Sequence, residues 1–169
     1  MKTVDRNYIS TLLADSIRLE ADHEPAQAFD KLARAVESFL PFDFEESQAQ
    51  KASNLFNSAM SEESIWRVIV EHSFTLASVS RELAYYVVLE NKEAADRLFA
   101  LGKEFEKSVN RGDRSVAAQL FSRWFLLIRN KRFHGDSAFQ GRNFRFAMKM
   151  KDFLRLLRIQ VEYFLTKSD

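Results

Sequence analysis

Turn-forming residues are scarce in this chain, and their scarcity limits what the chain can fold into. Only four Gly and two Pro occur among the 169 residues. Tight turns and β-hairpins rely on the positive φ of Gly and the fixed φ of Pro. Long helices joined by a few short loops use such a composition best. The length suits one domain. We therefore expect a single helical domain over residues 1–169, an all-α antiparallel bundle of several helices.

Apolar residues recur at the spacing of amphipathic helices, and neither strand-like alternation nor an internal repeat is visible. The pattern predicts helices over about 5–20, 25–40, 45–59, 61–89, 94–109 and 113–135, and a last helix that follows residues 140–143. Pro25 should occupy the first turn of its helix, and Pro41 should stop that helix. The expected buried face of the first helix is Ile9, Leu12, Leu13, Ile17 and Leu19. The expected buried face of the last helix is Phe146, Met150, Phe153, Leu157, Val161 and Phe164. Phe42 and Phe44 should pack onto the core.

Composition excludes several classes of site. The chain has no Cys, which excludes disulfides, thiolate nucleophiles and Cys-based zinc sites. No uncharged apolar stretch approaches the roughly 20 residues that a membrane-spanning helix needs. The polar N-terminal residues do not resemble a signal peptide. We therefore expect a cytoplasmic protein without a membrane segment.

The net charge of +1 hides an uneven distribution. Residues 101–169 contain 15 Lys and Arg against 7 Asp and Glu, whereas residues 1–100 contain 10 against 17. Such asymmetry between halves indicates a polyanionic partner for the basic part, such as a nucleic acid. The alternative is a solvated basic helix face.

One short segment, Arg129 to Gly135, contains residues that can act in catalysis. It follows a strongly apolar segment, residues 124–128, which should hold Arg129 at the edge of the core. In a continuous helix, Arg129 and His134 would lie about 140° apart around the axis. Gly135 favours a helix end, because glycine tolerates a positive φ. An end there would let His134 converge with Arg129. Alternatively, basic residues at a helix C-terminus simply complement the helix dipole.

The segment LLIRNKRFHG resembles the signature of the HEPN superfamily. That signature is an Arg, usually followed by a polar residue such as Asn, and then a His a few residues later. Arg129, Asn130 and His134 match these three positions. HEPN proteins are helical bundles that carry the motif near the end of a late helix, ahead of another helix. HEPN toxins often carry a Tyr two residues after the His, where this chain has Asp136, so regulation through that Tyr is not expected.

The resemblance implies a metal-independent endoribonuclease that acts as a homodimer. Histidine can donate or accept the proton when the RNA 2′-hydroxyl attacks phosphorus, and arginine can stabilise the charged phosphorane. Asn130 would orient this pair or bind phosphate, and no metal or cofactor is expected. The residues expected to bind the RNA backbone are Lys131, Arg132, Arg142, Arg145 and Lys149. The family also implies a bacterial role in toxin–antitoxin systems or antiviral defence, with an antitoxin or regulatory protein as a partner.

Two other functions fit the same residues. The chain can be a non-catalytic HEPN-like module that binds RNA or a protein. It can also be a scaffold or inhibitor bundle whose acidic N-terminal half recognises a partner.

Overall fold

The computed structural model describes residues 3–41, 45–140 and 151–167, and no strand occurs in these ranges. The prediction of an all-α protein is confirmed. No helix among the described residues is long and apolar enough to cross a membrane. The helices are α1 (Arg6–Ala21), α2 (Pro25–Phe39), α3 (Gln48–Met60), α4 (Glu63–Val87), α5 (Lys92–Asn110), α6 (Arg114–Phe133), the short 3₁₀ helix η1 (Ser137–Phe139) and α8 (Lys151–Lys167).

Polar side chains fix where four of the α-helices begin. In each case a side-chain oxygen accepts a hydrogen bond from the first turn, which satisfies an N–H group that has no partner inside the helix. The capping residues are Asp5 for α1, Ser47 for α3, Asn91 for α5 and Asp113 for α6. Pro25 begins α2 as predicted. Leu40 is extended because the Pro41 ring disfavours the helical conformation of the residue before it.

Two details of the sequence-based predictions are wrong. Helix α4 begins at Glu63 rather than at residue 61, and no side chain caps it; the Ser61 hydroxyl donates to the Asn57 carbonyl of α3 at 2.7 Å. Ile17 is 53% exposed rather than buried. It lies about 40° past Leu13 around α1, just beyond the arc that faces the core.

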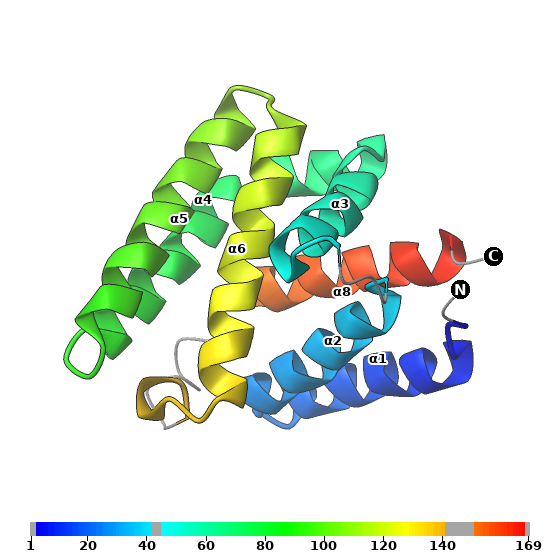
Figure 1. Ribbon diagram of the computed structural model, residues 1–169, viewed down its shortest axis with the longest axis horizontal. Coiled ribbons are helices and arrows are strands. Elements are labelled where there is room, and N and C mark those ends of the chain that lie inside the picture. The colour runs from blue at the N-terminus through cyan, green and yellow to red at the C-terminus, as the bar shows by residue number, and fades with distance from the viewer. Residues whose placement is uncertain (1–2, 42–44, 141–150, 168–169) are drawn as a thin grey trace.

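Helix α8 runs through the core of the molecule. It packs against α1, α2, α3 and α4, and Figure 1 shows it running from beside α6 toward the C-terminus, between α3 and α2. The ring of Phe153 lies 4.9 Å from Trp124 and 5.5 Å from Phe121, both on α6. The α8 residues that are fully or almost fully buried are Phe153, Leu154, Leu156, Leu157, Gln160, Val161 and Phe164. Phe42, Phe44, Phe146 and Met150 lie outside the described residues.

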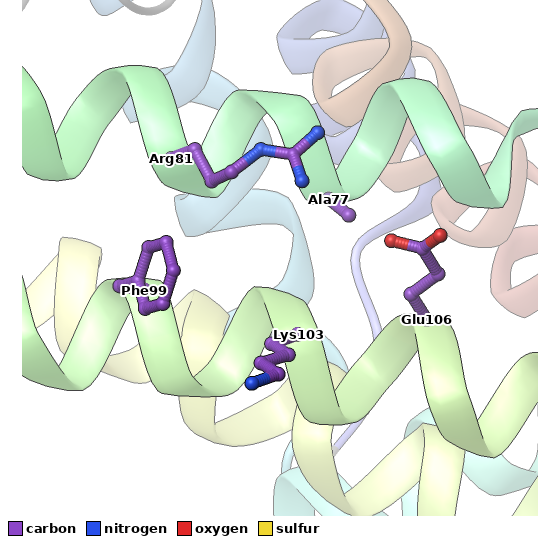
Figure 2. A pocket seen from close by; sticks show the side chains of 5 residues that line it. All are labelled: Ala77, Arg81, Phe99, Lys103 and Glu106. Atoms are coloured by element: carbon purple, nitrogen blue, oxygen red, sulfur yellow. The ribbon is translucent and has the colours of Figure 1, made fainter.

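Helices α4 and α5 approach each other closely at Gly102. A Cβ atom on this glycine would lie 2.9 Å from the Ser80 hydroxyl oxygen and closer still to the Ser80 Cβ. The Ser80 hydroxyl donates to the Leu98 carbonyl across the same contact. Beside this contact the two helices leave a mainly apolar groove, shown in Figure 2 and lined by Ala77, Arg81, Phe99, Lys103 and Glu106.

Candidate functional site

Helix α6 ends at Phe133, where the glycine predicted it would. Gly135 has a φ of 77°, and its N–H donates to the Arg132 carbonyl at 3.3 Å. The Asp136 N–H donates to the Lys131 carbonyl at 2.9 Å. These two bonds around a left-handed residue are the Schellman arrangement, which satisfies carbonyls that the helix leaves unpaired. His134 is therefore the last residue before the chain leaves the helix.

The side chain of His134 is exposed, whereas that of Arg129 is held by three neighbours. The Arg129 side chain is 21% exposed, and its Nε donates to Glu37 of α2. Its Nη1 donates to the Asn130 amide oxygen at 3.0 Å. Its guanidinium also lies 4.9 Å from the centre of the Phe133 ring. Two of the five guanidinium N–H groups are thus used among the described residues, which leaves three.

Arg132 makes an even more complete set of contacts with α2 and η1. Its guanidinium donates to both oxygens of Asp30, at 2.6 and 2.9 Å, and to the Phe139 carbonyl at 2.9 Å. Its side chain is only 12% exposed. A two-pronged bond between guanidinium and carboxylate is among the stronger polar contacts in proteins. Arg132 therefore fixes the end of α6 to α2, and little of it faces solvent.

The remaining predicted site residues are placed as follows. Lys131 lies 3.8 Å from the Asp136 carboxylate, which also accepts a hydrogen bond from Asn91 at 2.9 Å. Within the described ranges, no hydrogen bond or ion pair joins His134 to Arg129, so their convergence on a substrate stays a prediction. Arg142, Arg145 and Lys149 lie outside the described residues.

An open polar groove lies beside this helix end. Its lining residues are Asp30 and Arg34 of α2, Arg132 and Phe133 of α6, and Gln140. Arg34 is exposed and forms no ion pair with any described residue. Phe133 is 38% exposed, so part of its ring is open to a stacking partner. The groove thus offers a free guanidinium and an aromatic face close to His134.

Sequence reasoning missed Arg34 and the two carboxylates of α2. Glu37 lies 92 residues before Arg129, and Asp30 lies 102 residues before Arg132. No local pattern marks them, because each is simply a polar residue on an amphipathic helix. Within the described ranges, no group of three or more His, Asp or Glu side chains could hold a metal ion.

The geometry at Gly135 generates a stability prediction. Gly135→Ala is expected to destabilise the protein by about 1–2 kcal/mol, because a Cβ atom is strained at positive φ. Gly135→Asn should cost less, because Asn enters the left-handed region more readily than Ala. Urea unfolding followed by circular dichroism measures both. Equal stability of the alanine variant and the parent chain would contradict this account of the helix end.

Comparisons with protein-family models, curated proteins and solved structures found no match to this chain. The resemblance to the HEPN superfamily therefore rests on the motif from Arg129 to His134 and on the helical class of the fold.

Proposed function

We propose that this chain is a HEPN-type, metal-independent endoribonuclease whose helices form an antiparallel HEPN-like bundle. The observation that supports it is the end of α6. There, Arg129 is held rigidly at the edge of the core, and the exposed His134 leaves the helix one turn later. The Arg129 side chain is 21% exposed and His134 is exposed, and Phe133 between them lines a groove that also contains the exposed Arg34.

The chemistry is attack of the RNA 2′-hydroxyl on the adjacent phosphorus. A base removes the hydroxyl proton, the 2′-oxygen bonds to phosphorus, and the bond to the 5′-oxygen breaks as that oxygen gains a proton. The products are a 2′,3′-cyclic phosphate and a 5′-hydroxyl end. An imidazole can perform either proton transfer near neutral pH. The three remaining N–H groups of Arg129 can donate to the phosphorane oxygens.

The residues around this pair have supporting roles in the proposal. Asn130 accepts a hydrogen bond from Arg129 and so keeps its own amide N–H groups available for phosphate. Arg34 and Lys131 bind neighbouring phosphates, and the exposed part of Phe133 stacks on a base. Arg132 anchors the helix end and contributes positive charge rather than direct contacts.

A second copy of the chain would complete the site. One chain supplies one imidazole at this position, whereas two-fold pairing would supply one imidazole as acid and another as base. Six of the nine large exposed apolar side chains of the described residues lie on α4, on α5 or between them: Val70, Phe74, Tyr85, Val88, Leu89 and Phe99. A concentration of this kind is typical of an interaction surface.

This α4–α5 surface suits a second copy because it carries both signs of charge. Arg81 and Glu106 lie on opposite helices of the groove in Figure 2, and neither forms an ion pair with a described residue. Two-fold pairing can therefore place Arg81 of each copy against Glu106 of the other. The connection from α4 to α5 also touches the loop after α6, through Asn91 and Asp136. Pairing at that end brings the two copies of His134 toward each other.

A second candidate is a module that binds RNA without cutting it. The observation in its favour is that Glu37 and Asp30 each engage one arginine of the motif, which reduces the positive charge open to substrate. The family resemblance suggests toxin–antitoxin or antiviral roles for the enzyme, with an antitoxin or regulatory protein as a partner.

Incubation of the pure protein with single-stranded RNA in EDTA tests the enzyme proposal. Cleavage is expected, and His134→Asn should reduce its rate by at least about 100-fold, since one proton transfer is lost. Arg129→Lys should also slow it strongly, although it keeps a cation beside Glu37 and so protects the fold.

The matched control is His23→Asn, because His23 is also an exposed histidine. Its rate should equal that of the parent chain. RNA that is bound but never cut by the parent would favour the second candidate. Cleavage that persists unchanged in His134→Asn would contradict the enzyme proposal.

The dimer is tested by exchanging charges. Arg81→Glu should raise the dimer dissociation constant at least about tenfold, because like charges would face each other across the interface. Adding Glu106→Arg to that variant should restore pairing. Analytical ultracentrifugation over a range of concentrations measures both, with Arg97→Glu as a control on an exposed part of α5 outside the groove. A parent chain that stays monomeric, or a double variant no better than the single one, would rule out this interface.

A further inference from the structure

A second polar pocket lies where the start of α3 meets the middle of α6. The residues that line it are Ser47, Ala49, Gln50, Ser53, Gln119, Ser122 and Arg123. No carboxylate is among them. Apart from the methyl group of Ala49, their side chains are hydroxyls, amides and one guanidinium, all of which can donate hydrogen bonds. Such a lining favours an anion.

The start of α3 contributes backbone donors to this pocket. The Ser47 hydroxyl oxygen accepts from the Gln50 N–H at 3.1 Å. The N–H groups of Gln48 and Ala49 have no hydrogen-bond partner among the described residues. Unpaired N–H groups and the positive end of the dipole make the beginning of a 13-residue helix favourable for negative charge. A helix start alone does not identify a ligand, so independent observations are needed.

The first independent observation concerns the side chain of Ser53. It is only 7% exposed, yet its hydroxyl forms no hydrogen bond with any described residue. The other buried serines all donate to a backbone carbonyl: Ser16, Ser73, Ser80, Ser108 and Ser122. Ser53 lines the pocket, so its hydroxyl is available to a ligand there. A ligand oxygen in the pocket would satisfy it.

The second independent observation concerns the side chain of Arg123. It is exposed and lines the pocket, and it forms no ion pair with any described residue. Gln119 lies one turn earlier on the same face of α6, and its side-chain amide is likewise without a described partner. Glu45 and Glu46 precede α3 but do not line the pocket. The guanidinium is therefore available to a negative ligand.

We propose that this pocket binds a phosphate group through the Ala49 N–H group, the Ser53 hydroxyl and the Arg123 guanidinium. A tetrahedral oxyanion accepts hydrogen bonds in several directions, as a set of donors from two helices requires. The phosphate comes either from a bound RNA chain or from free phosphate. The proposal does not depend on the catalytic role of His134, because the pocket shares no residue with that site.

Titration with inorganic phosphate, followed by amide NMR at constant ionic strength with chloride as the reference anion, tests this site. The amides of the pocket residues Ala49 and Gln50 are expected to shift with saturation. Arg123→Gln should weaken binding at least about tenfold, because a charge-assisted hydrogen bond is lost. Ser53→Ala should weaken binding by a smaller factor without loss of the fold. Arg111→Gln is the control, since Arg111 is an exposed arginine outside the pocket.

A short single-stranded RNA added to the phosphate-bound protein distinguishes the two sources. If the RNA displaces phosphate from these amides, the pocket holds a phosphate of the RNA backbone. If it does not, the pocket holds free phosphate. Both results support the site, and both can be obtained with His134→Asn, so failure of the enzyme proposal leaves this one intact. Amides that do not respond to phosphate, or that respond equally in Arg123→Gln, would overturn it.

Discussion

Two ion pairs between α2 and the last turns of α6 determine what the candidate site can be. Arg129 binds Glu37, and Arg132 binds both oxygens of Asp30. Each pair is partly shielded from water, so loss of either carboxylate would leave a half-buried guanidinium without its partner. The motif arginines are therefore positioned by a helix that lies far away in the sequence.

The same two ion pairs limit the positive charge that the candidate site exposes to a substrate. Two carboxylates offset two guanidinium groups, so attraction of a polyanion depends on cations that the pairs do not engage. Arg34 is one, in the groove beside Phe133. Arg123 is another, in the pocket beside the start of α3. We thus propose two phosphate sites along α6, whose apolar middle packs against α8 through Trp124. An RNA chain that contacted both would cross the surface of this helix.

The sequence predicts the helices well because helix signals are local. Gly135 marks the end of α6, Pro25 the start of α2, and Asn91 and Asp113 cap the helices that follow them. Predictions fail where a residue has two competing local roles or sits at the edge of a buried face. Ser61 closes α3 instead of opening α4, and Ile17 falls just outside the buried arc of α1.

The candidate site is only partly predictable for a related reason. Arg129, Asn130 and His134 stand out because they are close in sequence and resemble a family signature. Glu37, Asp30 and Arg34 reach them only through packing of α2 against α6, and the missing partner of Ser53 becomes visible only when every buried hydroxyl can be compared. Non-local pairing of this kind leaves no pattern in a single sequence.

We propose that this chain cuts RNA through the 2′-hydroxyl next to the scissile phosphate. Two oligonucleotides that differ only at the nucleotide that is cut, one with ribose and one with 2′-deoxyribose there, test this. We expect the all-ribose oligonucleotide to be cleaved in EDTA and the 2′-deoxy oligonucleotide to be left intact at that position. Equal cleavage of both, or cleavage of neither, would contradict it.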